Sequence, residues 1–589
     1  MTRRLLVAVL AALLLVTGCA TVPTKGTIRS GSRQGLAPEL GGVGVEAKPP
    51  KDNLKALPLV SGFLEAMSDS QAFDVARQYM TPEAGAAWKP ESQTVVYAQR
   101  PEALSEQPGG VKLTARKIAT INERGEWIPA GANEPADFFF KLTKVNGQLR
   151  VASAPRGAYL GSNQVDLKLA PRDLYFFNQT RDMLVPDPVY LPLNLSSGQA
   201  ATQLVQELLK GPTDRLKGGV VTLAQPGTEV QVSVPVEFGV ATVALNDTAA
   251  TLRDQERRLL AAQIVWTLNQ ISLRVKITVG GAPLLPDDPD ILPFANFSQY
   301  DPSMPSGALN ALYGLKLGKV QRIDGLDGAS EIAPKPLNSS QLYPYAARAF
   351  AVNLHGDAGA IVTTVDGDEV VAYAKLDATD KADEVKKIAV DGKVLPPSYD
   401  SQDNLWIVDR AEGPSPRLQV RNRDGDVSTV KANFRGDAPV VLKMAPDGVR
   451  ALLVMRSKAT GQNYVQTGTV QSANGGKQLV LGQFRQLRLQ LTNITDAAWN
   501  NKGVLVVGVN PTGNLNRQPW LVNSDGSGLQ PLPGSPAAFA ALRVASNPNL
   551  NTLPVVEDVE GRVHWLSRDL LWTPMDPDNG DPVVPVYPG

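Results

Sequence analysis

The sequence offers few side chains of the kinds that enzymes use as nucleophiles or general bases. Its 589 residues include one cysteine, Cys19, and two histidines, His355 and His564. The Gly-x-Ser-x-Gly, His-Glu-x-x-His and Gly-x-x-x-x-Gly-Lys-[Ser/Thr] motifs do not occur. We therefore predict no catalytic residue, no metal ligand and no cofactor, and we interpret both histidines as structural or surface residues.

Acidic residues leave two alternatives open. The clusters Asp287-Asp288-Pro289-Asp290 and Asp424-Gly425-Asp426 could bind calcium, but neither has the ligand spacing of an EF-hand. We interpret them as solvated loops and hairpin turns. A glycosidase that uses two carboxylates also remains possible, because such a pair is assembled in space and leaves no local motif.

The cysteine follows a short apolar segment at the N-terminus. Two arginines precede the run Leu5–Val16, which is twelve residues long, and Thr17 and Gly18 separate that run from Cys19. A helix that spans a bilayer needs about 20 apolar residues, so this run is too short. A charged start, a short apolar run and small residues predict a signal peptide over residues 1–18, cleaved between Gly18 and Cys19.

The residues around the predicted cleavage site resemble a bacterial lipobox, in the order Val16-Thr17-Gly18-Cys19. The resemblance implies that Cys19 becomes an N-palmitoyl, S-diacylglycerol cysteine. It also implies a lipid-anchored protein on the extracytoplasmic face of the cell membrane. The alternatives are an ordinary signal peptide that happens to contain a cysteine, or a buried thiol.

Composition favours a large folded body behind this anchor. Hydrophobic residues make up 43% of the chain and charged residues 20%. Lysine plus arginine equals aspartate plus glutamate at 58 each, which argues against nucleic acid as a partner. The length suggests roughly three or four domains. Since Cys19 is the only cysteine, no disulfide can form within the chain.

A tether is predicted to precede the first domain. Residues 19–50 are rich in Gly, Pro and Ser and lack apolar periodicity, so we expect a flexible segment. Residues 52–165 then change from helical to strand periodicity, which predicts an α+β domain. The helices should include one that starts at Thr81-Pro82, and Asn146-Gly147 should form a hairpin. Helices followed by a bent sheet and this last hairpin resemble the NTF2-like or cystatin-like fold.

Residues 170–286 predict a second α+β domain. Strands are expected at Asp173–Phe177 and Val189–Leu195, a helix capped by Ser197 that stops at Gly211-Pro212, and a strand along the alternating valines from 230 to 236. A helix from about 251 to 271 and a strand from 273 to 279 follow. The order, and the stretch Leu208-Leu209-Lys210-Gly211-Pro212, resemble the GerMN domain of spore-germination lipoproteins. That resemblance implies a binding module without known catalytic residues.

Residues 305–589 predict an all-β domain. Nine Asp-Gly or Asn-Gly dipeptides lie in this region, against one in the first 300 residues. An apolar strand recurs at Ile361, Trp406, Leu452 and Leu505, with gaps of 45, 46 and 53 residues. Because one four-stranded propeller blade takes about 40 to 50 residues, the region fits a β-propeller of about five or six blades. The stretch Leu442–Arg450 resembles the blade signature of TolB-like propellers. A pair of β-sandwiches is the alternative.

The complete order of parts resembles the LpqB family of actinobacterial lipoproteins. A lipobox, an α+β domain, a GerMN-like domain and a C-terminal propeller together carry the resemblance. It implies a binding accessory factor of a two-component system, in contact with the sensor histidine kinase MtrB. Through MtrB it would affect MtrA signalling, cell-envelope homeostasis and division, without enzyme activity. The alternative is a propeller that binds or processes cell-wall glycan.

Overall fold

A computed structural model describes residues 47–67, 73–98, 103–303, 311–324, 333–377, 384–473, 478–513, 515–534, 538–575 and 583–589. Glu39–Gly589 form one compact unit of three successive folded parts. Within the described ranges, no helix is both long enough and apolar enough to cross a membrane.

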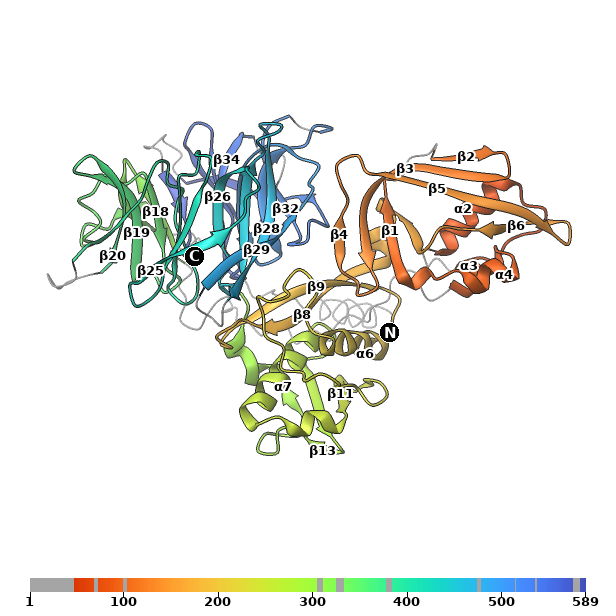
Figure 1. Ribbon diagram of the computed structural model, residues 1–589. Helices are drawn as coiled ribbons and strands as arrows, with labels where there is room; N and C mark the ends of the chain where they lie inside the picture. The colour runs from red at the N-terminus through yellow and green to blue at the C-terminus, as the bar shows by residue number, and fades with distance from the viewer. Residues whose placement is uncertain are drawn as a thin grey trace, which may run out of the picture. The chain divides into compact units, whose positions relative to one another are not determined.

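The first part is an α+β domain (Figure 1). Its helices are α2 (Ala56–Met67), α3 (Phe73–Gln78) and α4 (Pro82–Ala87). Its sheet contains β1 (Gln93–Tyr97), β2 (Leu104–Gln107), β3 (Gly110–Asn122), β4 (Trp127–Pro129), β5 (Pro135–Val145), β6 (Gln148–Ser153) and β7 (Ala158–Gly161). The strand order is β6-β5-β3-β1-β7, with β2 and β4 pairing onto the long strand β3.

Local chemistry explains these elements. The Thr81 hydroxyl accepts a hydrogen bond from the Ala84 amide and Pro82 occupies the first turn, so α4 starts where the sequence predicts. Asn146 and Gly147 both adopt positive φ in the tight turn between β5 and β6. Helix α2 buries Leu59, Val60 and Phe63 against the sheet, which closes the core of this domain.

The second part begins with the hairpin of β8 (Leu169–Phe177) and β9 (Leu184–Pro192). Helices α6 (Ser197–Leu209) and α7 (Asp254–Leu268) follow, with a sheet of β10 (Val236–Glu237), β11 (Val240–Leu245), β12 (Arg274–Val279), β13 (Ala282–Pro283) and β14 (Leu292–Pro293). Strands β11 and β12 run parallel, joined through α7. The hairpin, both helices and the sheet share one apolar core.

Two details of this domain differ from the prediction. The N-cap of α6 is Ser196, not Ser197, because Ser196 forms a reciprocal capping box with Gln199. The alternating valines from 230 to 236 do not form a continuous strand: Val232 is 85% exposed, Val230 makes a single bridge to Leu245, and the ladder resumes only at β10. The Val234 amide donates to the Thr202 hydroxyl, and Pro235 has no amide hydrogen to donate to a ladder.

The third part is a propeller of six four-stranded blades. Blades two to four are β18–β21 (Ala349–Val352, Ala358–Val365, Asp368–Lys375, Lys386–Ala389), β22–β25 (Ser398–Tyr399, Leu405–Asp409, Arg417–Arg421, Val427–Ala432) and β26–β29 (Ala438–Met444, Arg450–Arg456, Asn463–Ala473, Gln478–Gln486). Blades five and six are β30–β33 (Thr492–Asn500, Gly503–Val509, Gln518–Val522, Gln530–Pro531) and β34–β37 (Ala541–Ala545, Val555–Asp558, Val563–Leu566, Trp572–Pro574). The outer strands of blades three and four also pair, through β25 and β29.

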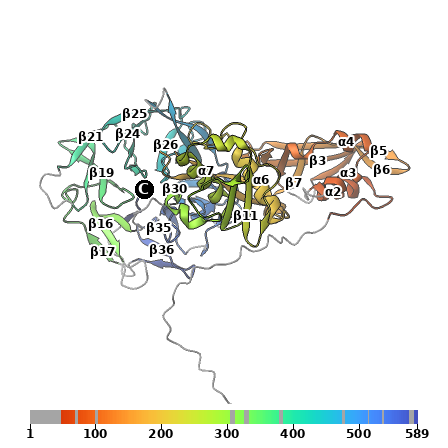
Figure 2. The same cartoon turned by 90° about the horizontal axis from the view of Figure 1, so that it is seen from below.

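Blade one closes the ring. Strands β15 (Leu312–Lys316), β16 (Lys319–Asp324) and β17 (Ala333–Pro336) are completed by the C-terminal strand β38 (Val583–Val586), which pairs with β15. The innermost strands β18, β22, β26, β30, β34 and β38 contact one another in that order, and β38 contacts β18 again. Figure 2 shows the blades arranged around the C-terminus. This radial repetition excludes the β-sandwich alternative.

The predicted repeat positions all lie on the second strand of a blade. Leu452 and Leu505 are fully buried, and each packs toward the following blade, as the repeat predicts. Trp406 also packs toward its following blade. Ile361 differs, because it packs against blade one, the preceding blade, while its neighbours Ala360 and Val362 face blade three. The sequence spacing identified the second strand correctly in each of these four blades.

Candidate functional site

The predicted lipidation residue Cys19 and the cleavage residue Gly18 lie outside the described residues. His564 lies on β36, where its Nε2 is 2.9 Å from Asp558 Oδ2 and its ring stacks on Phe539 at 3.9 Å between centroids. His355 lies in the turn between β18 and β19. His355 is therefore a turn residue and His564 a strand residue.

The acidic clusters form ion pairs or turns. Asp288 pairs with Arg258 at 2.8 Å, and Asp290 pairs with Lys276 at 3.2 Å. Asp426 lies in a turn in which its amide donates to Asn422 Oδ1. No group of three or more His, Cys, Asp or Glu side chains in the described ranges is arranged to hold a metal ion.

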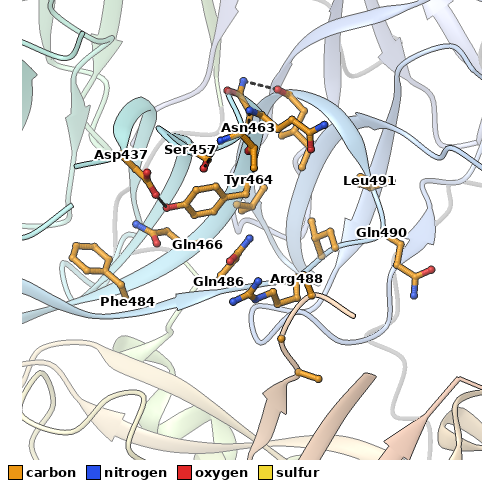
Figure 3. A pocket seen from close by; sticks show the side chains of 18 of the residues that line it. Asp437, Ser457, Asn463, Tyr464, Gln466, Phe484, Gln486, Arg488, Gln490 and Leu491 are labelled. Atoms are coloured by element: carbon orange, nitrogen blue, oxygen red, sulfur yellow. Dashed lines mark hydrogen bonds between the residues drawn. The ribbon is translucent and has the colours of Figure 1, made fainter. Parts of the chain in front are cut away.

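The largest of four cavities considered, about 710 Å³, is a cleft between the first domain and blade four, where it meets blade five (Figure 3). We call it the blade-four cleft. One wall comes from β3 and the residues after β4, including Arg116 and Asn133. The other comes from β28, β29 and the loops beside them. Its volume is within the range of ligand pockets, which is about 300–1,000 Å³.

Polar and aromatic side chains line this cleft. Tyr464 donates its hydroxyl hydrogen to Asp437 at 2.7 Å, and Asp437 also accepts from the Lys458 amide at 2.9 Å. Burial, and then the bond to Asp437, raise the pKa of Tyr464. Phe434 and Phe484 pack 5.9 Å apart between centroids. Asp437 is the only carboxylate in the lining, and its oxygens are already occupied by these two donors.

Next to the cleft, the turn between β3 and β4 joins the first domain to the second. The Arg124 guanidinium donates to the carbonyl oxygens of Glu207, Gly211 and Pro212 at 2.7–3.0 Å, and it pairs with the Glu207 carboxylate at 3.1 Å. These carbonyls lie at the C-terminal end of α6, where helix backbone acceptors lack partners. Arg124 therefore caps a helix of the neighbouring domain.

Replacing Arg124 by Ala should destabilise the protein by about 2–3 kcal/mol, because several charge-assisted hydrogen bonds are lost together. The free energy of unfolding in urea would measure this loss. Arg116→Ala, on the preceding strand, is the matched control, because the Arg116 guanidinium makes no ion pair with described residues and should cost less than about 0.5 kcal/mol. Equal effects of the two substitutions would contradict the capping role.

Glu126, in the same turn, brings together charges from all three domains. It is 1% exposed, and its Oε1 lies 3.1 Å from Arg485 Nη2 of the propeller. Arg215 of the second domain is 6% exposed, lies close enough to lower the pKa of Glu126, and has two guanidinium nitrogens without hydrogen-bond partners. Burial outweighs both arginines, so the pKa of Glu126 is raised overall. Thr469 of blade four completes the junction by donating to the Arg215 carbonyl at 2.8 Å.

A second carboxylate, Asp173 of β8, is partly buried and lines a cavity of about 310 Å³ that Arg450 of the propeller also lines. Burial raises the pKa of Asp173 to about 6, against the lowering effect of Arg450. A carboxyl group whose pKa is higher in the folded state stabilises the fold when it is protonated. This contribution is complete below the unfolded pKa, near 4, and is lost as the pH rises through 6.

We therefore expect the free energy of unfolding of the wild type to fall by at most about 3 kcal/mol between about pH 4 and pH 7, as Asp173 ionises. The variant Asp173→Asn cannot ionise at this position and should not show that fall. Melting temperatures measured at pH 5 and pH 8 would show a smaller difference for the variant than for the wild type. Asp166→Asn, at an exposed position in the same region, should leave the difference unchanged. An identical pH dependence in Asp173→Asn and the wild type would contradict this assignment.

The centre of the propeller contains a further cavity of about 410 Å³. Lys443 and Asp496 both line it, and burial lowers the pKa of the lysine and raises that of the aspartate. The Asp496 oxygens accept hydrogen bonds from the amides of Ala497 and Val544, each at 2.9 Å. None of the four cavities considered has two Asp or Glu side chains in its lining.

Comparison with known proteins assigns each folded part. Residues 49–166 match the model of the lipoprotein LpqB N-terminal domain, and residues 330–588 match that of the lipoprotein LpqB beta-propeller domain. Residues 173–285 match a sporulation and spore germination model. Lipoprotein LpqB of Thermobifida fusca is 28% identical, over 98% of this chain and 97% of its own. The chain belongs to the LpqB lipoprotein family. LpqB of Mycobacterium bovis is 27% identical over the same shares of the two chains.

Solved structures similar to the LpqB propeller are only distantly related. TolB from Acinetobacter baumannii aligns with a TM-score of 0.35 and 15% identity, covering 48% of this chain and 68% of its own. A chain of a nidogen/laminin complex aligns with a TM-score of 0.34 and 12% identity, covering 47% and 97%. The six-blade assignment depends on the strand pairing described above.

Sequence reasoning missed both the blade-four cleft and the three-domain junction of this LpqB protein. The cleft residues come from the first domain and the propeller, and the junction residues from all three domains, so no local motif joins them. One signal was available: the turn Glu123-Arg124-Gly125-Glu126 is strongly charged and is followed by Trp127, an unusual neighbour for a purely solvated turn. Gly125 has positive φ, and a side chain there would meet the Tyr190 carbonyl oxygen at 2.8 Å.

Proposed function

We propose that this protein is a lipid-anchored accessory factor of a two-component system that acts by contact at the extracytoplasmic face of the membrane. The match over nearly the whole length to LpqB lipoproteins carries this proposal. The lipobox at Cys19 would supply the anchor, and the partner would be the extracytoplasmic part of the sensor histidine kinase MtrB. Binding there would modulate MtrA signalling.

The three-domain junction supports action by contact. The turn of residues 123–127 makes hydrogen bonds or ion pairs with both other domains, so the three domains would present one continuous surface. A partner that touches any domain would then meet a pre-organised surface, which reduces the entropy cost of binding. We propose no turnover of substrate.

Glycan processing by two carboxylates is the competing proposal. A retaining or inverting glycosidase needs two carboxyl groups within about 5–10 Å of each other. The four cavities have at most one each, which favours binding over cleavage. The volume of the blade-four cleft nevertheless favours the binding of a ligand there without its cleavage.

Capture from membranes would test the proposal. Lipidated, affinity-tagged protein would be solubilised in mild detergent from cells that also produce the kinase. We expect MtrB to co-purify, and to be lost when its outer segment is deleted. Recovery of equal MtrB with and without that segment would contradict the proposed contact. Release of wall glycan fragments by the purified protein, abolished by one Asp or Glu substitution, would establish the competing proposal instead.

A further inference from the structure

Three arginine side chains line the blade-four cleft without forming an ion pair with a described residue, although Arg488 lies close enough to Glu134 to help lower the pKa of that carboxyl group. Arg116 comes from β3 of the first domain, and Arg435 and Arg488 come from loops of the propeller. Within the described part of the chain, none of the three guanidinium groups forms an ion pair or hydrogen bond. Asp437 is the one carboxylate of the lining, and it is committed to Tyr464 and the Lys458 amide. The cleft is therefore strongly cationic, which favours an anionic ligand.

The two propeller arginines also have an unusual backbone. Arg435 and Arg488 each have φ of 54°, in the left-handed region that side chains other than Gly and Asn seldom occupy. A glycine would adopt this backbone conformation with less strain. Residues with a strained backbone conformation are often found at ligand-binding sites.

Amide side chains accompany the arginines. Gln466 and Gln486 stand opposite each other on β28 and β29, and Gln490 lies on the loop beyond. Figure 3 shows Gln486 beside Arg488 and Gln466 near Tyr464, with Gln490 further away. In the ranges described, none of the three amide groups has a hydrogen-bond partner in the protein. A carboxamide can donate and accept at once, which suits a ligand rich in hydroxyl groups.

The cleft offers little strand edge to an extended peptide. Strand β28 pairs with β27 along its cleft-lining residues, and β3 lies between β1 and β5. Strand β25 pairs with β29 only at Val480 and Leu481, so only the short edge of β29 at Phe484 and Gln486 is not covered by β25. A sheet usually captures a peptide by pairing along a whole strand edge, which this short stretch does not provide. Aromatic rings such as those of Tyr464 and Phe484 instead offer surfaces for the C–H faces of a sugar ring.

We propose that the blade-four cleft binds an acidic oligosaccharide, a short sugar chain that carries carboxylate groups. The arginines would pair with the carboxylates, the glutamines with ring hydroxyls, and the aromatic rings with sugar faces. The cleft would bind the sugar without cleaving it, because its single carboxylate cannot act as the pair that hydrolysis needs. This proposal does not depend on the proposed kinase contact.

Isothermal titration of the full mature body would test the site with three probes. Tetragalacturonate carries one carboxylate on each sugar, cellotetraose is its neutral counterpart, and tetra-aspartate is an acidic peptide. We expect tetragalacturonate to bind at least about tenfold more tightly than either other probe, and more weakly as salt is raised. Equal binding of tetra-aspartate would overturn the sugar assignment, and no binding of tetragalacturonate would overturn the site.

Variants would locate the binding. Arg488→Gln and Gln486→Ala should each weaken tetragalacturonate binding by about tenfold or more. Arg488→Gly should weaken it equally while folding at least as well as the wild type, since glycine accepts a positive φ. Arg423→Gln, at an exposed turn of blade three, is the matched control and should bind normally. Unchanged binding in Arg488→Gly would overturn the proposal, and kinase capture by the same variants would test the contact independently.

Discussion

Replacing Cys19 by Ala should abolish attachment to the membrane. Each acyl methylene buried in a bilayer contributes about 0.8 kcal/mol, and the lipobox implies two or three acyl chains on this one residue. Without the thiol, the expected product is an uncleaved or mislocalised precursor, and the membrane-bound fraction of mature protein should fall by about tenfold or more. Cell fractionation and mass spectrometry of the mature N-terminus would measure both effects.

Thr21→Ala, two residues beyond the predicted cleavage site, is the control and should leave lipidation intact. A mature N-terminus at Cys19 carrying diacylglycerol and an acyl group is the expected wild-type result. An unmodified N-terminus at any other residue would contradict the assignment of the anchor.

The second large effect is expected at Glu126. Its replacement by Ala would leave the propeller's Arg485, and the buried Arg215, without their shared carboxylate. Removing one partner of a buried ion pair typically costs 3–5 kcal/mol, and we expect about 3 kcal/mol because the Arg485 side chain is 24% exposed. Urea unfolding and limited proteolysis between the domains would measure the loss.

Two further variants separate the charge from its surroundings. Glu123→Ala, in the same turn, is exposed and should change stability by less than about 0.5 kcal/mol. Glu126→Gln keeps an oxygen for Asn122 but cannot ionise. Because burial raises the pKa of Glu126, the wild type should lose stability as the pH rises from the unfolded pKa, near 4.5, through the higher folded value, and the Gln variant should not. A Glu126→Ala cost as small as that of Glu123→Ala would contradict the junction.

Elements with strong local signals were predicted from the sequence. The hairpin at Asn146-Gly147 and the helix start at Thr81-Pro82 depend on backbone preferences of those residues, and the structure has both. The propeller followed from regular spacing, since each blade repeats one local pattern. The prediction that Ser197 caps helix α6 was wrong by one position. Choosing between adjacent residues depends on side-chain bonds and blade contacts that one sequence does not contain.

One strand prediction failed within a domain. Val232 alternates with its neighbours like a strand residue but is 85% exposed, because the Thr202 hydroxyl and Pro235 interrupt the ladder.

Contacts between domains could not be predicted from the sequence. Arg124 and Glu126 lie in one short charged turn of the sequence, but their partners lie in other domains. Charged side chains in such a turn become buried only when segments distant in the sequence pack against it. The local sequence pattern does not show which distant segments will do so.

The central claim, contact at the membrane, has a direct test. The predicted tether of about 30 residues would, as a flexible chain, reach on the order of 30 Å. It would then keep the body close to the outer segments of its membrane neighbours and raise its effective concentration for them. Vesicles containing MtrB would be mixed either with the lipidated protein or with the same body lacking lipid, at equal total concentration, and kinase autophosphorylation would be measured. We expect the lipidated protein to change the rate and the soluble body to need at least about tenfold more protein for the same change. Equal potency of the two forms, or no change with either, would contradict the account.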